Sequence, residues 1–214
     1  MAVRRIGVMG GMFDPVHRGH LEAANVAIRT LDLDALHLIP CAQPNHREPA
    51  LADAVKRLEM LRLAVAGQPK LKVDDRELRR GGVSYTVDTL LSLAEEFPGA
   101  MLVLVLGVDA FASLPGWHQW QGLFALAHIL VLNRPGPEVS FNEDLALDLQ
   151  CRQVPEAERL FTVPQGRILR LDEPKIELSS TQVRECLRRG ENVDALLPPA
   201  VAEFIREKGL YTAR

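Results

Sequence analysis

The chain has 214 residues, of which 47% are hydrophobic and 25% charged, with a formal net charge of −3 at pH 7. This composition is typical of a globular protein with a substantial core, and it gives no global field for binding nucleic acid or an acidic membrane. The three scattered cysteines and the lack of a signal-peptide pattern favour the cytoplasm, and the apolar runs, including 123–132, are too short to span a bilayer.

The first predicted elements are a buried strand over residues 3–9, a glycine turn at Gly10 and Gly11, and a helix that begins near His17. Glycines let main-chain N–H groups approach a phosphate closely, and a helix start adds unpaired N–H groups and partial positive charge. His17 and His20 are spaced i,i+3, so both imidazoles fall on one face of the first turn. The segment therefore predicts a site whose donors stabilise charge at a reacting phosphorus.

The string from Gly10 to His20, GGMFDPVHRGH, resembles the signature of the nucleotidyltransferase family that uses an HxGH motif, in particular the nicotinate-mononucleotide adenylyltransferases. Met12 stands where that family usually carries Thr or Ser, which leaves the backbone for phosphate contacts. Two histidines are also typical of half a metal site, but no further ligands follow in a compact pattern, so no metal-binding residues are predicted. The resemblance implies contacts to ATP by Gly10, Gly11, Met12, Phe13, His17 and His20, with the two histidines catalytic.

A helix over 21–31 and a strand over 35–39 are predicted to complete a right-handed β-α-β unit. The loop over 40–49 contains three prolines and leaves the carboxyl end of that strand, where ligands of open α/β sheets bind. His46 and Arg47 in this loop resemble a basic pair that the family places near its phosphates. Arg47 is therefore predicted to bind substrate, and a solvated loop cation is the alternative.

The next predicted elements are a helix over 53–66, a strand over 71–73, a charged connection over 76–82 that ends in glycine, and a helix from about 84 to 96. Ser84 or Thr86 could cap the last helix and leave N–H groups unpaired at its start. Its opening resembles the family segment that receives the pyridine mononucleotide, which implies substrate contacts by Ser84, Tyr85 and Thr86. A capped helix with Tyr85 as a packing residue is the structural alternative.

Residues 101–106 are a continuous apolar run, which is typical of a central parallel strand buried on both faces. Gly107 and Asp109 follow it, and a carboxylate at that place can accept hydrogen bonds from ribose hydroxyls. Trp117 offers a flat face for stacking on a pyridine ring, whereas Trp120 is assigned to packing. This arrangement again resembles the adenylyltransferases and implies that Gly107 and Asp109 contact ATP and that Asp109 and Trp117 contact the second substrate.

A fifth strand is predicted over 127–132, and Arg134 at its carboxyl end is predicted to bind substrate. The signal over 139–164 is weak, with a helix at 145–149 and an extended segment at 160–163. A last strand is predicted over 168–171.

Three hydroxyl residues, Ser179, Ser180 and Thr181, precede a further predicted helix, and Arg184 lies on the same face. Hydroxyl and backbone donors beside an arginine suit the β- and γ-phosphates of a nucleotide, although a Ser/Thr cap with an exposed arginine is the common alternative. The family has an Ile-Ser-Ser-Thr-x-x-Arg motif that contacts ATP phosphates, and Leu178 replaces the isoleucine here. A terminal helix is predicted over 198–209.

We therefore predict one α/β domain over residues 1–214, a Rossmann-like doubly wound parallel sheet with a small C-terminal helical part. The resemblance implies transfer of AMP from ATP to nicotinate mononucleotide, giving nicotinate adenine dinucleotide (deamido-NAD) and pyrophosphate in NAD biosynthesis. Mg²⁺, bound mainly through the ATP phosphates, is the expected cofactor.

Other functions are also compatible with the sequence. Nicotinamide mononucleotide, phosphopantetheine or, with CTP, a phosphorylated alcohol could be the acceptor, and a nucleotide-binding sensor without catalysis is the alternative from another class. No nucleic-acid or membrane partner is expected, and both a monomer and a homodimer fit the sequence.

Overall fold

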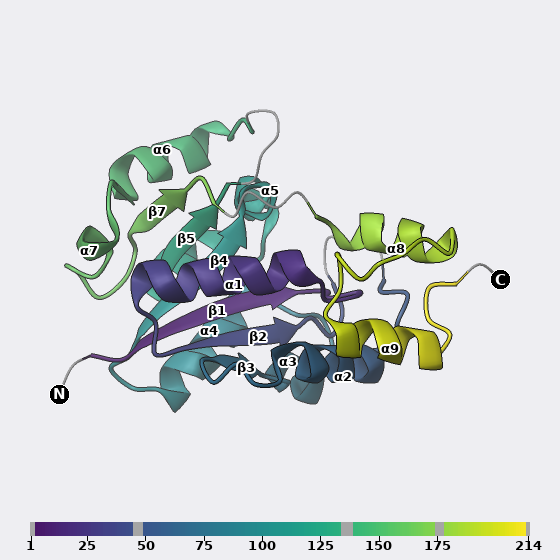
Figure 1. Ribbon diagram of the computed structural model, residues 1–214. Coiled ribbons are helices and arrows are strands. Elements are labelled where there is room, and N and C mark those ends of the chain that lie inside the picture. The colour runs from purple at the N-terminus through teal and green to yellow at the C-terminus, as the bar shows by residue number, and fades with distance from the viewer. Residues whose placement is uncertain (1–2, 45–48, 134–138, 174–177, 213–214) are drawn as a thin grey trace.

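The structure is a computed structural model that describes residues 3–44, 49–133, 139–173 and 178–212. In this part of the chain seven parallel strands form one sheet in the order β3-β2-β1-β4-β5-β7-β6 (Figure 1). The strands are β1 (Arg5–Gly11), β2 (Ala35–Pro40), β3 (Leu71–Val73), β4 (Met101–Gly107), β5 (His128–Leu132), β6 (Gln153–Val154) and β7 (Ile168–Leu171).

Helices connect these strands. They are α1 (Arg18–Leu31), α2 (Ala54–Val65), α3 (Arg76–Arg80), α4 (Thr86–Glu96), α5 (Val108–Ala112), α6 (Glu143–Arg152), α7 (Ala157–Leu160), α8 (Ser180–Arg188) and α9 (Pro199–Glu207), with short 3₁₀ helices η1 (Leu114–Gly116) and η2 (Trp120–Ala125). Among the described helices, none combines the length and the apolar composition that crossing a membrane requires.

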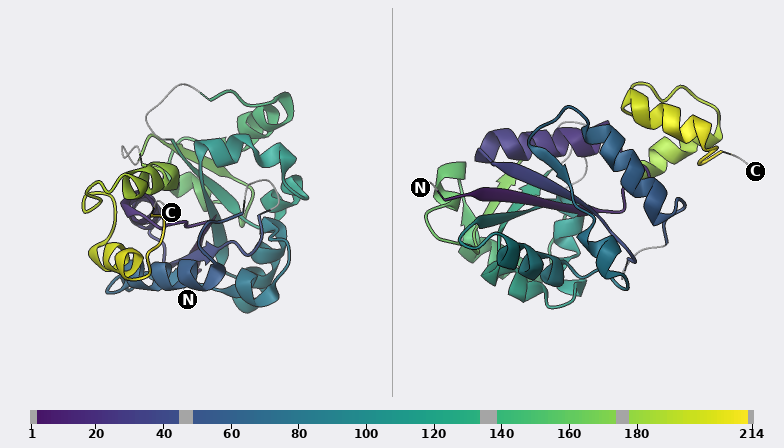
Figure 2. Two further views of the ribbon diagram at one scale, coloured as in Figure 1. Left: turned by 90° about the vertical axis from the view of Figure 1, so that its right-hand side faces the viewer. Right: turned by 90° about the horizontal axis from the view of Figure 1, so that it is seen from below.

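Both faces of the sheet are buried, because side chains alternate along each strand and helices cover each side. In β4, Val103 and Val105 join the apolar cluster beneath α1 and α2, whereas Leu102 and Leu104 join the cluster beneath α4, α5 and α6. The C-terminal helices α8 and α9 lie beyond the tips of the strands, next to the start of α1 (Figures 1 and 2). They pack onto the α1 side of the core through Val183, Val201 and Ile205.

The strand order reverses direction between β1 and β4, which are direct neighbours in the sheet. From β1 the chain moves outward through β2 to β3, then returns to β4 and continues through β5 on the other side. Doubly wound sheets bind ligands outside the carboxyl ends of the strands at such a switch point. The prediction of a doubly wound parallel sheet is confirmed, and the two glycines at 10–11 and Gly107 lie at its switch point.

Three local expectations are wrong. Gly10 and Gly11 are the last residues of β1 and pair with β2, so the turn begins after them. The connection over 76–82 contains α3, a helix of five residues that lacks apolar periodicity and is supported by an i,i+4 ion pair between Arg79 and Asp75. The segment 160–163 is not extended, because α7 ends at Leu160 and a turn follows, while the unexpected strand β6 precedes α7.

Candidate active site

The loop between β1 and α1 is shaped by the side chain of Phe13. This residue has a φ of 49°, in the left-handed region, and its ring is buried. A Cβ at Gly11 would lie 3.1 Å from the Phe13 ring, so the ring occupies the space that glycine leaves. The edge of the ring also meets His20, with centroids 5.0 Å apart. Phe13 therefore supports the histidine with its side chain and has only its backbone left for the predicted contact to ATP.

The two motif histidines stack on each other where α1 begins. Their ring centroids are 3.7 Å apart with an angle of 27° between the planes, which bears out the shared face expected from the i,i+3 spacing. The backbone N–H of His17, the N-cap residue, donates to Nδ1 of His20 over 3.2 Å. Because Nδ1 accepts, a neutral His20 carries its proton on Nε2 and keeps a donor there.

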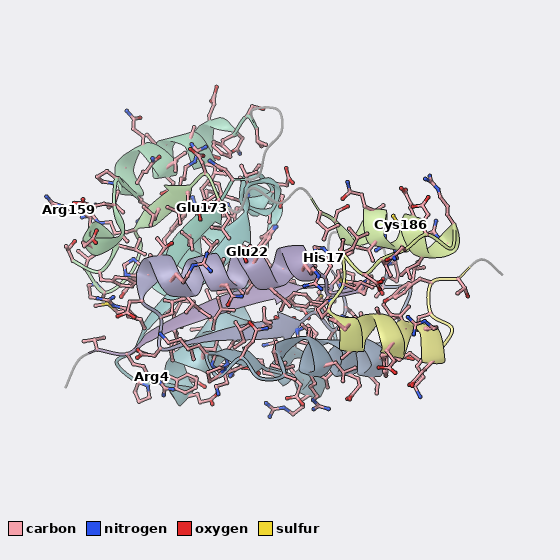
Figure 3. All side chains as sticks on the ribbon, in the orientation of Figure 1. Arg4, His17, Glu22, Arg159, Glu173 and Cys186 are labelled. Atoms are coloured by element: carbon pink, nitrogen blue, oxygen red, sulfur yellow. The ribbon has the colours of Figure 1, made fainter. Side chains whose placement is uncertain are left out.

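Gly19 is needed for this stack as well as for access. A Cβ at Gly19 would lie 3.1 Å from Nδ1 of His17, closer than side chains normally pack, and 3.4 Å from Cβ of Leu178, in van der Waals contact. His17 lies at the end of α1 that faces α8, whereas Arg4 and Arg159 lie at the opposite end of the sheet (Figure 3). The glycine thus lets the C-terminal part of the chain approach the histidines.

Both histidines are neutral at pH 7 in the free protein. Burial lowers the pKa of His17 to about 4. Burial, followed by the charge of His17, lowers the pKa of His20 well below its usual range. Each ring can therefore donate one hydrogen bond without carrying a net charge. Nδ1 of His17 is buried and has no hydrogen-bond partner among the described residues, which is unusual for an interior polar atom.

The start of α8 meets the loop after β1. The Ser180 hydroxyl donates to the carbonyl of Pro15 over 3.0 Å, and Nη1 of Arg184 donates to the carbonyl of Asp14 over 2.8 Å. Nη2 of Arg184 donates to the Thr181 hydroxyl over 3.1 Å, as expected for residues on one helix face. The structure therefore brings together two motifs that lie more than 160 residues apart in the chain.

Ser179 has a local role at this helix start. It is the N-cap of α8, and its hydroxyl accepts from the backbone N–H of Gln182 while the Gln182 side chain accepts from the Ser179 N–H. This is a capping box. A capping role for Ser179 and a phosphate-binding role for the next two hydroxyl residues can therefore coexist.

The start of α4 is tied to the loop after β2. The Ser84 hydroxyl accepts from the N–H of Ala42, and the Ser84 N–H donates to the carbonyl of Gln43, both over 3.0 Å. Tyr85 is the N-cap and makes no side-chain cap, so the expectation that Ser84 or Thr86 caps the helix is wrong. Because no side chain caps this end, the first N–H groups of α4 can donate to a ligand.

Asp109 and Trp117 follow the carboxyl end of β4. Asp109 lies in the first turn of α5, whose N-cap is Gly107, and a Cβ at Gly107 would meet no atom within 4 Å. Trp117 is partly exposed, and its indole N–H donates to the hydroxyl of Ser113 over 3.1 Å. The neighbouring His118 ring lies against Tyr85, with centroids 4.4 Å apart, which joins this segment to the start of α4.

Trp120 meets Phe124 edge to face at 6.1 Å and borders the core, in agreement with its assignment to packing. Two further predicted substrate residues, Arg47 and Arg134, lie outside the described residues. The predicted site residues that are described thus form two groups at the carboxyl edge of the sheet. One surrounds the motif histidines and α8, and the other surrounds the start of α4 and Trp117.

Sequence reasoning missed Arg57. This arginine of α2 is 2% exposed, and it donates through Nη1 to the carbonyl of Met12 (2.8 Å) and through Nη2 to that of Cys41 (2.7 Å). It therefore joins the loops that follow β1 and β2. A signal was available, since Arg57 occupies the same helical register as the buried Met60, Leu61 and Ala64. A charge on the apolar face of a helix indicates a buried partner.

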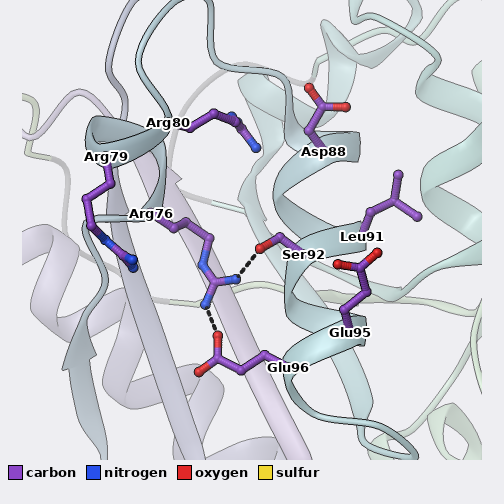
Figure 4. Close-up of a pocket in the computed structure, with 8 residues that line it drawn as sticks. All are labelled: Arg76, Arg79, Arg80, Asp88, Leu91, Ser92, Glu95 and Glu96. Carbon is purple, nitrogen blue, oxygen red and sulfur yellow. Dashed lines mark hydrogen bonds and ion pairs between the residues drawn. The ribbon is translucent and has the colours of Figure 1, made fainter.

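A shallow depression of about 600 Å³ between α3 and α4 contains none of the predicted site residues (Figure 4). Its lining residues are Arg76, Arg79, Arg80, Asp88, Leu91, Ser92, Glu95 and Glu96. Arg76 pairs with Asp74 and Glu96, and Arg79 pairs with Asp75, so much of the positive charge there is already neutralised. The residues predicted to bind phosphate lie elsewhere, in the loop after β1 and at the start of α8.

A model of a known family matches most of this chain. The cytidylyltransferase-like family model matches residues 8–186, from within β1 into α8, and the chain belongs to this family.

Several relatives match this chain over almost its full length. A protein of Methylococcus capsulatus is 45% identical over 207 residues, which cover 96% of this chain and 99% of the relative. A protein of Marinobacter nauticus is 41% identical over a match that covers 97% of this chain and 96% of the relative. A protein of Pseudomonas syringae pv. tomato is 44% identical over a match that covers 98% of this chain and 95% of the relative. All three bear the name "Probable nicotinate-nucleotide adenylyltransferase".

Solved structures agree in fold. Plasmodium falciparum nicotinic acid mononucleotide adenylyltransferase complexed with NaAD superposes with a TM-score of 0.73 at 17% identity, covering 97% of both chains. The same enzyme complexed with APC gives a TM-score of 0.73 at 16% identity with the same coverage.

Proposed function

We propose that this chain is a nicotinate-nucleotide adenylyltransferase of NAD biosynthesis. It transfers AMP from ATP to nicotinate mononucleotide and releases pyrophosphate. The observation that carries this proposal is the stack of two neutral imidazoles at the switch point of the sheet, with Arg184 of α8 held against the same loop. The full-length similarity to relatives named for this activity supports it.

The reaction needs alignment more than it needs a protein nucleophile. An oxygen of the mononucleotide 5′-phosphate forms a bond to the α-phosphorus of ATP, and the bond from that phosphorus to the oxygen bridging to the β-phosphate breaks. The attacking phosphate is already ionised, so no general base is required. Holding the two phosphates in line can contribute about 7 to 11 kcal/mol, and one oriented donor about 3 to 4 kcal/mol.

The motif histidines are assigned to the α-phosphate. His20 donates from Nε2, because the N–H of His17 occupies its Nδ1. Since burial keeps both rings neutral, they need no bound counter-ion before the substrate arrives, and their donors gain strength as negative charge develops on the phosphoryl oxygens. The pair thus stabilises the transition state more than the bound substrate.

The start of α8 is assigned to the leaving pyrophosphate. Arg184, Ser180 and Thr181 present a guanidinium and hydroxyl groups beside the loop after β1. Backbone groups at Gly10 and Gly11, together with Asp109, are assigned to the rest of ATP. A Cβ at Gly10 would meet no atom within 4 Å, so a ligand can approach the backbone there.

The second group of residues is assigned to nicotinate mononucleotide. The backbone N–H groups of Tyr85, the N-cap of α4, and of Thr86, its first residue, can donate to the nicotinate carboxylate, and Trp117 offers a face for the pyridine ring. Arg47 and Arg134 are proposed to bind the acceptor phosphate. A carboxylate gains more than an amide from N–H donors, which favours the acid over nicotinamide mononucleotide.

Mg²⁺ is proposed to be held by phosphate oxygens and water. Among the described residues there is no group of three or more His, Cys, Asp or Glu side chains that could hold a metal ion. Phosphate oxygens and water are donors that suit Mg²⁺, which keeps several waters and binds substrate phosphates. When bound, the ion would neutralise part of the phosphate charge. We also propose a cytoplasmic location, which the three cysteines, none of them in a disulfide, favour.

The test is pyrophosphate release from ATP in the presence of either nicotinate mononucleotide or nicotinamide mononucleotide. We expect turnover with the acid, a lower kcat/KM with the amide, and loss of turnover when EDTA removes Mg²⁺. Tight ATP binding without release of pyrophosphate from ATP, whichever acceptor is present, would instead identify a nucleotide-binding sensor. A higher kcat/KM with the amide would overturn the assignment of the acceptor.

A further inference from the structure

The C-terminal end of the described chain reaches back into the loop after β1. Tyr211 lies just beyond α9, and its hydroxyl donates to Oδ1 of Asp14 over 2.6 Å, although 197 positions separate the two residues. Asp14 is buried, with 4% of its surface exposed. A hydrogen bond to a buried carboxylate is short and strong, so it links the chain terminus firmly to this loop.

The Asp14 side chain also accepts from two backbone groups. The N–H of Leu51 meets Oδ2 at 2.7 Å and the N–H of Ala52 meets Oδ1 at 3.0 Å, while the backbone carbonyl of Asp14 accepts from Arg184. These five residues, Asp14, Leu51, Ala52, Arg184 and Tyr211, are called the Asp14 junction below. The junction joins the loop after β1, the approach to α2, helix α8 and the end of the chain.

Two further features of Tyr211 accompany its hydrogen bond to Asp14. Its φ is 61°, a backbone conformation that a bulky residue adopts only when surrounding contacts hold it there. Burial, and then the hydrogen bond to Asp14, raise the pKa of the hydroxyl far above its usual value. The hydroxyl therefore keeps its proton over the whole physiological range and acts as the donor to the carboxylate.

The junction lies next to the groups assigned to phosphate. Asp14 is three residues before His17, and its carbonyl receives the same guanidinium that is assigned to the leaving pyrophosphate. Arg57 holds the carbonyl of Met12, two residues before Asp14. The loop is thus fixed on one side by α2 and on the other by the end of the chain.

We propose that Tyr211 is a positioning residue for adenylyl transfer, which sets the histidines and Arg184 relative to each other by fixing Asp14. The proposal rests on the proposed function for its catalytic consequence. If Tyr211 only completed the core, its loss would lower folding stability. If it fixes the loop after β1, its loss disturbs the alignment of the reacting groups, and small misplacements of these groups lower kcat steeply.

The kinetic test compares three variants of the full enzyme. Tyr211→Phe removes only the hydroxyl, and a chain that ends at Leu210 removes the residue. The matched control ends at Tyr211 and lacks only residues 212–214. For both test variants we expect kcat to fall about tenfold or more while KM for ATP changes less than about threefold. The control should keep kcat within about twofold of the full-length enzyme.

Hydrogen exchange gives a readout that does not depend on turnover. In Tyr211→Phe we expect about tenfold faster exchange at residues 12–20 and at the amides of Leu51 and Ala52, and unchanged exchange in β5. Unchanged exchange in the loop, or a kcat equal to that of the full-length enzyme, would overturn the proposal. If the full-length chain lacks adenylyl transfer, the proposed function fails, and the exchange measurement still decides whether Tyr211 fixes the loop.

A double-mutant cycle with Asp14→Ala tests whether Tyr211 acts through the Asp14 side chain. If it does, the double variant loses no more loop protection than Asp14→Ala alone, because alanine leaves the Tyr211 hydroxyl without its acceptor. Additive losses in exchange protection would show that Tyr211 acts by another route and would overturn the proposal.

Discussion

Two regions of this molecule gather histidine and arginine side chains that are buried or half-buried, yet they are built differently. The first consists of His17, His20 and Arg184, which are proposed to contact the phosphates, and is called the active-site group here. The second lies at the β3 edge of the sheet and is called the edge network here. It consists of His37, Asp74, Arg76, Ser92 and Glu96.

The polar side chains of the edge network form hydrogen bonds with one another. Asp74 accepts from Nδ1 of His37 at 2.9 Å and from Nε of Arg76 at 2.8 Å. The remaining nitrogens of Arg76 donate to the hydroxyl of Ser92 and to the carboxylate of Glu96 (Figure 4). Although burial raises the pKa of Asp74, the hydrogen bonds from His37 and Arg76 outweigh it and hold the pKa far below its usual value. Such a network fixes the fold but leaves little bonding capacity for a ligand.

The active-site group retains unused capacity. Nδ1 of His17 and Nε of Arg184 are buried and have no hydrogen-bond partner among the described residues. An unpartnered atom alone does not identify a site, because Nε2 of His128, in β5, is in the same condition. The distinguishing feature is the position of the His17 and Arg184 atoms, in and against the loop after β1 at the carboxyl edge of the sheet, where a phosphate ligand can complete them.

The comparison is tested most strongly by Asp74→Asn. Removing the charge leaves Arg76 in a buried site without its main partner, so we expect the free energy of unfolding to fall by about 3 to 5 kcal/mol. The value of kcat should stay within about twofold, because the edge network lies outside the active site. Urea unfolding and pyrophosphate release measure the two effects. A loss of kcat without a loss of stability would reverse the roles assigned to the regions.

The reciprocal change is His20→Ala. We expect kcat to fall at least about a hundredfold, equivalent to about 3 kcal/mol or more, because an oriented donor to the transition state is lost. Stability should change by only about 1 kcal/mol, the effect of losing the acceptor for the His17 N–H at the helix start. Steady-state kinetics and urea unfolding on the same preparation provide the measurement. Near-normal turnover would remove His20 from the mechanism.

Acid pH tests whether His17 and His128 are buried in their neutral form. Burial lowers the pKa of His17 and of His128 to about 4, whereas an unfolded histidine titrates near 6.5. Between pH 6.5 and 4 the unfolded chain binds protons that the folded protein does not, so stability falls as the pH falls. Each histidine contributes up to about 3 kcal/mol to this loss and none to the slope above pH 6.5.

Urea unfolding at pH 7, 6 and 5 measures this loss, and His128→Gln should reduce it without affecting the His17 share. The same free energy of unfolding at pH 7 and at pH 5 would contradict the burial of neutral histidines.

Much of the fold was predictable because strand and helix signals are local. The bounds of β3 and β7 and the end of α4 agree with the expectations, since short apolar runs and a 3.6-residue period report directly on burial. The helix α3 was missed because its support comes from charged side chains. The prediction of Ser84 or Thr86 as a cap failed because the Ser84 hydroxyl receives an N–H from the loop after β2.

Local sequence patterns were enough to predict which side chains are available for phosphate chemistry. The two histidines at i,i+3, the hydroxyl run and Arg184 predict a phosphate site, and their helical spacing places the members of each motif together. The contacts between these motifs could be seen only in the tertiary structure. The stacking of the rings, the lowered pKa of His17, the reach of Arg57 into two loops and the bond from Tyr211 to Asp14 depend on residues far apart in the chain. Burial and charge proximity are properties of packing, and local sequence patterns do not specify them.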